Sequence, residues 1–112
     1  MSRKRAKRLR EVKPVRDAFR EENPWCQWPG CNARAEVLHE IARGAARGKA
    51  LDQPAALLHI CHQHHTHAHN KPSVVRDLKV KQIANDGTYD LAKVNELRGR
   101  VIEQSEVDGW ML

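Results

Sequence analysis

Three cysteines and one histidine occur as two closely spaced pairs of the kind that hold a metal ion. Cys26 and Cys31 are separated by four residues, among them a proline and a glycine that favour a tight turn. Thirty residues after Cys31, the pair Cys61 and His64 is separated by two residues. Thiolate and imidazole are the usual ligands of tetrahedral structural zinc. The four residues therefore predict a structural Zn²⁺ site, with His62 as the alternative fourth ligand.

A second group of histidines has the spacing of an open metal site. His39 follows the apolar residues 37–38, so we expect it near the end of a strand. His65 and His69 are four residues apart, and a helix that begins just after Cys61 would place both on one face. Three protein ligands leave coordination positions for water and phosphate, which metal-dependent catalysis requires. The three histidines are therefore predicted to hold a second, catalytic metal.

Length and composition limit the class of protein. The chain has 112 residues, 40% of them hydrophobic and 4% aromatic, which predicts one small domain with extensions and a core that needs added support. Three cysteines cannot all pair with one another, and six of the seven histidines lie within residues 59–69, so metal binding is favoured over disulfides. No apolar run reaches the ~18 residues of a membrane span, and the first twenty residues lack a signal sequence. We expect a cytoplasmic protein without membrane partners, because zinc thiolates need a reducing compartment.

The positive charge is concentrated at the start of the chain. Residues 1–20 contain nine basic and two acidic residues, whereas the remainder contains eleven and twelve. The run 1–13 is interpreted either as a solvated tail or as an arm that binds phosphates and stays disordered until it does so. The candidate DNA-binding residues of this arm are Arg3, Lys4, Arg5, Lys7, Arg8 and Arg10.

Local signals predict three helices outside the region of the cysteines and histidines. A short helix is expected over 14–22, beginning at Pro14 and ended by Asn23-Pro24. Two more are expected over 73–84 and 89–105, with a turn at 85–87 between them. The apolar stripe of the last helix, which we expect to dock on the core, consists of Leu91, Val94, Leu97 and Val101.

Residues 24–72 together resemble the HNH endonucleases of the ββα-metal (His-Me finger) type. The order that carries the resemblance is Cys-x4-Cys, Val-Leu-His-Glu-Ile, a loop with glycine and arginine, and Leu-Leu-x-Ile-Cys-x2-His-His-x3-His. Small phage-encoded HNH proteins are also similar in length and in their basic start. The resemblance implies a small α+β fold with a zinc-knuckle-stabilised ββα-metal core over 24–72. A basic arm and short helix at 1–23 would precede this core, and a helical extension at 73–112 would follow it.

The resemblance also implies roles for the individual residues of the second site. His39, His65 and His69 fall on ligands of a catalytic metal, which could be Mg²⁺, Mn²⁺, Ni²⁺ or Zn²⁺. Glu40 falls where the family has its general-base histidine, so we take Glu40 as the base and His39 as a ligand. In the alternative register, shifted by one residue, His39 is the base and only His65 and His69 hold the metal.

Two further features bear on catalysis. The loop after the expected strand contains Arg43, Arg47 and Lys49 among glycines, and these cations are predicted to contact phosphates beside the scissile bond. The asparagine that orients the base histidine in the family would fall near Ala55 or Ala56, and alanine cannot supply that contact.

The function implied by the resemblance is a metal-dependent DNA endonuclease or nickase, phage or prophage encoded, that leaves 5′-phosphate and 3′-hydroxyl ends on double-stranded DNA. The alternative is a catalytically degenerate, zinc-stabilised DNA-binding or packaging adaptor. A third interpretation is an interaction module whose 73–112 helices dock on phage packaging or replication proteins, supported by the apolar residues 110–112.

Overall fold

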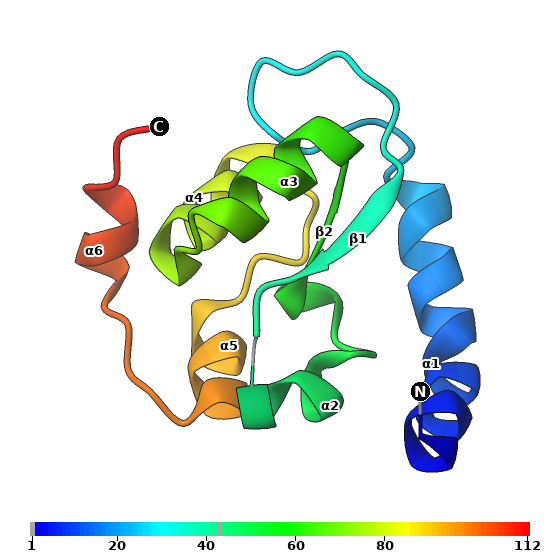
Figure 1. The fold of residues 1–112 in the computed structure, drawn as a ribbon. Coiled ribbons are helices and arrows are strands. Elements are labelled where there is room, and N and C mark those ends of the chain that lie inside the picture. Colours follow the sequence, from blue (N-terminus) through cyan, green and yellow to red (C-terminus); the bar gives the residue numbers. More distant parts are fainter. Residues whose placement is uncertain (1, 43) are drawn as a thin grey trace.

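The computed structural model describes residues 2–42 and 44–112 and has a small α+β fold, as predicted. Its two strands pair antiparallel, and a helix follows the second strand directly, so that β1, β2 and α3 form a ββα arrangement (Figure 1). No helix among these residues is long and apolar enough to cross a membrane. The longer elements are α1 (Arg3–Glu22), β1 (Val37–Glu40), β2 (Leu57–Ile60), α3 (His62–Asn70), α4 (Val74–Ala84) and α5 (Leu91–Arg98).

The two-stranded sheet separates α1 from the remaining large helices (Figure 1). Its register pairs Leu38 with His59 and His39 with Leu58. Because side chains alternate between the faces of a sheet, Leu38 and Leu57 face α1, where they pack on Phe19. His39 and Leu58 face the opposite side, toward α3 and α4. β2 is buried along its whole length because both of its faces are covered.

The first helix is longer than predicted. α1 begins at Arg3, so the expectations of an irregular arm over 1–13 and of a helix starting at Pro14 are wrong. An internal proline costs a helix about 3 kcal/mol. Docking offsets this cost, since Val12, Arg16 and Phe19 are buried at helical spacing on one face of α1. The end predicted at Asn23 is confirmed.

Polar contacts also hold α1 against the segment between the strands. The Arg16 guanidinium donates a hydrogen bond of 3.2 Å to the carbonyl oxygen of Leu51. Arg8, two turns earlier, donates to the carbonyl oxygen of Gly48 at 3.3 Å and pairs with Asp52 at 3.2 Å. The basic helix is thus fixed to the body of the protein at its start as well as at its centre.

The segment between the strands is partly helical instead of the open loop expected. It contains the short helices η1 (Gly44–Ala46), α2 (Arg47–Ala50) and η2 (Pro54–Ala56). Small side chains allow this segment to pack closely against α5. Ala42, Ala50 and Ala56 form a small buried cluster, and Leu97 of α5 packs at its edge. Arg43 lies outside the described residues.

The C-terminal region follows the predicted order with one correction. α4 ends at Asn85, which is left-handed at φ 49°, and the turn at 85–87 is confirmed. The single helix predicted over 89–105 is wrong, because Gly99 at φ 67° ends α5 and the chain begins a new helix, α6 (Gln104–Asp108). Val94 of the predicted stripe is buried, but Val101 lies beyond the break and is 78% exposed.

A buried ion pair joins α4 to the sheet. The Lys81 ammonium, fully buried, donates to the carbonyl oxygen of Leu57 in β2 and to the Asp86 carboxylate, both at 2.9 Å. The same nitrogen lies 5.0 Å from the centre of the Phe19 ring of α1. Burial lowers the pKa of Lys81, and the Asp86 carboxylate opposes that shift. The pair therefore connects α4, β2 and α1 at one point.

Replacing Asp86 by alanine should lower the free energy of unfolding by about 3 kcal/mol, because Lys81 would stay buried without its counter-charge. Denaturant unfolding of the zinc-loaded protein measures this loss. Asp17→Ala, which removes a carboxylate paired with Lys13 and Arg20 on the surface of α1, is the matched control. It should leave the unfolding free energy near that of the wild type. Equal losses in the two variants would contradict the role of the buried pair.

The effect of Asp86→Ala should also depend on pH. Burial alone would raise the pKa of Asp86, but hydrogen bonds from Thr88 and the charge of Lys81 outweigh it and lower this pKa. A carboxyl group with a depressed folded-state pKa stabilises the fold above about pH 4 and loses that contribution as the pH falls through the folded-state pKa. The difference in stability between wild type and variant should therefore shrink on acidification. A stability difference that stays constant down to low pH would contradict a depressed pKa of Asp86 in the folded protein.

Candidate active site and metal centre

The two cysteine and histidine pairs come together as predicted. The ligand atoms of Cys26, Cys31, Cys61 and His64 all lie within 4.8 Å of one another, close enough to hold a metal ion. His64 presents Nδ1 to two sulfurs, 3.2 Å from that of Cys61 and 3.7 Å from that of Cys26. A tetrahedron with Zn–S bonds of ~2.3 Å has edges of about 3.8 Å. The donor atoms and their spacing therefore fit a structural zinc ion.

Local conformation explains how each pair is presented. Gly30, at φ 77°, makes the turn that brings Cys31 back toward Cys26. Cys61 is the N-cap of α3, so His64 follows within the first turn of that helix. His62, the alternative ligand, is exposed and lies outside the group of four. The choice of His64 over His62 is thus decided by the position at which α3 begins.

The surroundings of the thiols change the pKa values of Cys26 and Cys31 in opposite directions. Burial raises the pKa of Cys26 to about 11, so this thiol stays protonated at neutral pH without a metal. A hydrogen bond involving the backbone of Ala33 lowers the pKa of Cys31. Zinc binds thiolates, so its charge would displace the proton from Cys26.

The fourth ligand is held by aromatic packing. The Trp28 ring stacks on the His64 ring with centroids 4.9 Å apart and an interplanar angle of 7°. The guanidinium carbon of Arg76, from α4, lies 5.4 Å from the centre of Trp28. Trp28 also packs against the main core cluster, whereas Trp25 is 59% exposed.

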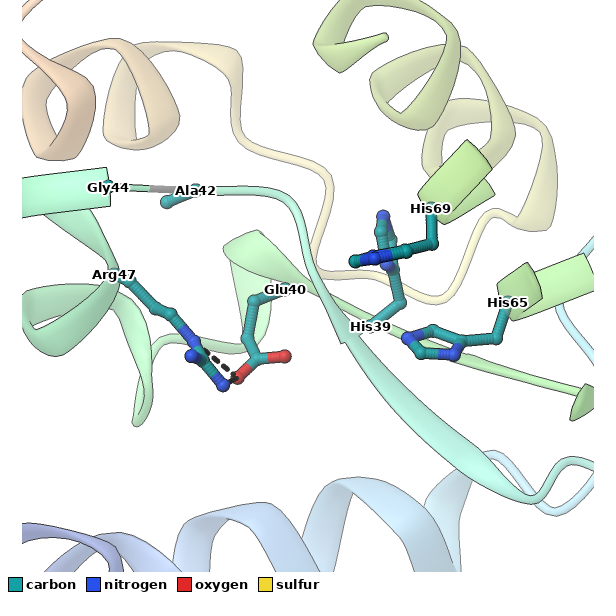
Figure 2. A pocket seen from close by; sticks show the side chains of 7 residues that line it. All are labelled: His39, Glu40, Ala42, Gly44, Arg47, His65 and His69. Carbon is teal, nitrogen blue, oxygen red and sulfur yellow. Dashed lines mark hydrogen bonds and ion pairs between the residues drawn. The ribbon is translucent and has the colours of Figure 1, made fainter. Parts of the chain in front are cut away.

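A cavity of about 360 Å³ opens beside the ββα unit (Figure 2). His65 and His69, one turn apart on α3, face His39 of β1 across it. The ring centroids of His39 and His65 are 5.6 Å apart, and those of His65 and His69 are 6.3 Å apart. Within residues 2–42 and 44–112, the cysteine centre is the one group of three or more His, Cys, Asp or Glu residues whose ligand atoms lie close enough to hold an ion, so the three histidines do not form such a group as they stand. The lining residues are His39, Glu40, Ala42, Gly44, Arg47, His65 and His69.

His39 is held by a buried carboxylate from α4. Its Nε2 lies 2.8 Å from Oδ2 of Asp77, and the two side chains are 4% and 1% exposed. Arg76 bonds the other oxygen of Asp77 at 3.0 Å. A carboxylate paired with a guanidinium only accepts hydrogen bonds, so Nε2 of His39 carries the proton. In the neutral imidazole, Nδ1 then carries the lone pair, which can accept a proton or bind a metal.

The Glu40 side chain leaves β1 on the face opposite to His39. As the residue after His39 in a strand, it points to the face covered by α1, where its carboxylate lies 4.0 Å from Arg16. The Arg47 guanidinium donates two hydrogen bonds, of 3.0 and 3.2 Å, to the same Oε1 (Figure 2). Glu40 thus reaches the rim of the cavity as the anchor of Arg47.

The predicted phosphate-binding residues are placed in three ways. Arg47 lines the cavity, and Lys49 is exposed on α2. Arg8 is committed to contacts within the protein. Ala55 and Ala56 are buried in η2. The other predicted DNA-binding residues of α1, which are all exposed, are Arg3, Lys4, Arg5, Lys7 and Arg10.

The sequence reasoning missed Asp77 and Arg76. Both are buried in α4, and no metal-ligand spacing includes them. One signal was available, because Asp77 lies on the same helical face as Val74, Leu78 and Lys81, among apolar residues. A carboxylate on an apolar stripe has to find a buried partner.

Comparisons with models of known protein families, with curated proteins and with solved structures find no match to this chain.

Replacing Cys31 by serine should remove one zinc ion per chain and lower the melting temperature by about 10 °C or more, because a structural zinc site contributes folding free energy directly. Metal analysis of the purified protein and thermal unfolding measure the two effects. His62→Ala, in the same turn of α3 as His64 but outside the centre, should change neither. Full zinc content in Cys31→Ser would show that the centre does not use this thiol.

Proposed function

We propose that this chain is a metal-dependent phosphodiester hydrolase, a DNA endonuclease or nickase of the HNH type. The observation that carries the proposal is the meeting of His39 from β1 with His65 and His69 from α3 at one cavity, with His39 oriented by a buried carboxylate. The ββα order of the elements and the adjoining Cys3His centre support it. The resemblance of residues 24–72 to that family gives the substrate class.

His65 and His69 are the residues that would hold the catalytic divalent ion. Their rings are one helical turn apart on the open side of α3, and a modest rotation of either side chain would bring the two rings closer. When bound, the ion would polarise a phosphoryl oxygen and neutralise charge on the leaving oxygen. Imidazole ligands suit Ni²⁺ or Zn²⁺ better than Mg²⁺.

His39 acts as the general base in this proposal, which adopts the shifted register in preference to Glu40. Asp77 holds Nε2–H, so Nδ1 accepts the proton from the water that attacks phosphorus. Asp77 also stabilises the imidazolium that forms. It thereby does the orienting work that the family assigns to the asparagine missing at 55–56.

Arg47 would bind the phosphate in this scheme. Its guanidinium is held by Glu40, and its side chain stays 42% exposed at the cavity. A cation positioned in advance favours the extra negative charge that develops as water attacks. Glu40 is then a positioning residue, because its Oε1 accepts both hydrogen bonds that hold the Arg47 guanidinium.

A zinc-stabilised DNA-binding or packaging adaptor without activity is the second candidate. It is favoured by one observation, that the ligand atoms of His39, His65 and His69 do not form a ready-made group as those of the cysteine centre do. Binding without cleavage in every metal would identify it. Phage packaging or replication proteins are the proposed partners in that case.

The first test is nicking of supercoiled plasmid in Mg²⁺, Mn²⁺, Ni²⁺ and Zn²⁺. His39→Ala should lower the rate by about 10²- to 10⁴-fold, the usual contribution of a general base. His65→Ala should abolish cleavage by removing a ligand. Glu40→Gln should retain measurable activity, because an amide oxygen can still accept from Arg47.

His67→Ala is the matched control, since His67 is on the same helix as His65 and His69 but does not line the cavity. It should cleave like the wild type. Loss of cleavage in Glu40→Gln together with survival in His39→Ala would reverse the assignment of the base. A zinc-loaded wild type that binds DNA and is inactive in all four metals would leave the adaptor as the function.

The role of Asp77 has a separate test. Asp77→Asn should lower kcat by about 10- to 100-fold at unchanged KM, because an amide no longer fixes which nitrogen of His39 carries the proton. Zinc content and melting temperature are measured alongside. Asp90→Asn, which replaces the exposed N-cap of α5 by an equally good cap, should leave kcat unchanged. A rise in KM alone would mean that Asp77 does not act through the base.

A further inference from the structure

A second cavity, of about 520 Å³, lies between the start of α1 and α2. Its charged lining residues, among those that the structure describes, are Lys4, Arg5, Arg8 and Arg47, all cationic. Gly44 and Arg47 also line the histidine cavity, so the two cavities adjoin. Figure 1 shows the N-terminal end of α1 beside α2, where the contacts of Arg8 hold it.

The cavity continues the inner face of α1. Phe19, Arg16, Val12, Arg8 and Arg5 follow one another at intervals of three or four residues, so they share that face. Two cations of this face donate hydrogen bonds within the protein. Arg16 donates to the carbonyl oxygen of Leu51, and Arg8 donates to the carbonyl oxygen of Gly48 and to Asp52. Arg5 is the next residue of the series and reaches the cavity.

Arg5 and its neighbour Lys4 differ from these inner cations. Within residues 2–42 and 44–112, the side chains of Lys4 and Arg5 have no hydrogen bond or ion pair. Arg47 contributes a third cation, held from behind by Glu40. Three positive groups therefore converge on one hollow without an acidic residue among its described lining residues.

The glycines leave the wall of the cavity open. A Cβ atom built on Gly44 or Gly48 meets nothing within 4 Å, so the backbone there is bare toward open space. Gly44 also has φ 63°, a conformation that favours glycine. Cations beside exposed backbone form the kind of surface that phosphate groups contact in nucleic-acid complexes.

We propose that this cavity binds a backbone phosphate of the nucleic-acid strand, next to the phosphate that is cleaved in the histidine cavity. The inference rests on the proposed function for its substrate, and it assigns α1 a defined subsite in place of a diffuse basic arm. Lys4 and Arg5 are the ligands of that phosphate, and Arg47 is shared between the two cavities. Arg8 positions the helix.

The test compares two double variants of equal charge. Lys4→Gln/Arg5→Gln removes two cations inside the cavity, and Arg3→Gln/Lys7→Gln removes two exposed cations of the same helix that do not line it. Binding of a labelled DNA duplex is measured by fluorescence anisotropy over a range of salt concentrations, without a catalytic metal. Both variants lose the same net charge, so the long-range electrostatic attraction to DNA changes equally. A difference in affinity between them therefore measures the contribution of the cavity.

The cavity variant should bind duplex about 10-fold more weakly than the control variant. Its plot of log Kd against log salt should become shallower by about one, since the cavity holds a single phosphate and each phosphate contact contributes ~0.9 to the slope. Equal affinities in the two variants would overturn the proposal. Inorganic phosphate should shift the amide resonance of Gly48 in the wild type and not in the cavity variant. That shift combined with equal duplex affinities would mean that the site takes free phosphate, which also overturns it.

The same proteins separate this inference from the proposed function. Plasmid nicking by the wild type together with equal duplex binding in both variants would reject the subsite and leave the nuclease standing. Weaker binding in the cavity variant alone, with no nicking in any metal, would reject the nuclease and leave the subsite standing.

Discussion

The buried carboxylate of Asp77 is the contact on which the arrangement of the site depends. One of its oxygens bonds His39 of β1, and the other bonds Arg76. Arg76 in turn donates to carbonyl oxygens of Ala68 and Lys71 at the end of α3, which carries His65 and His69. The same guanidinium lies over Trp28, which stacks on a ligand of the cysteine centre. The Asp77–Arg76 pair in α4 therefore links the strand, the histidine helix and the candidate metal centre, and the low dielectric around the pair strengthens each bond.

The two-residue period of β1 divides the chemistry between two faces of the sheet. His39 faces α3, and Glu40 faces α1. Each then acquires the partner that its face provides, a carboxylate for the imidazole and guanidinium groups for the carboxylate. The cations of α1 have two different surroundings. Near the centre of the protein they bond to the protein and hold the helix in place, and toward the start of the helix they line a cavity.

The parts of this molecule that could be predicted are those set by short-range spacing. The turn between Cys26 and Cys31 and the helix after Cys61 bring each ligand pair together locally, and the ends of α1 and α4 follow from Asn23-Pro24 and from the turn at 85–87. The errors have a common origin. Both predictions used only local helix preferences. Docking of the inner face of α1 stabilises the helix across Pro14, and the left-handed conformation of Gly99 ends the helix that was predicted over 89–105.

The sequence by itself predicted the three cysteines of the candidate metal centre and the shared helical face of His65 and His69, because both depend on local spacing, whereas the structure decided between His62 and His64. Only the tertiary structure decided that Asp77 orients His39, that Glu40 holds Arg47, and that the start of α1 closes a cationic cavity over α2. These contacts join residues from separate elements, and each depends on how helices pack on a two-stranded sheet. The spacing of residues in the sequence does not give these distances between elements. They result from the burial of apolar faces that lie far apart in sequence.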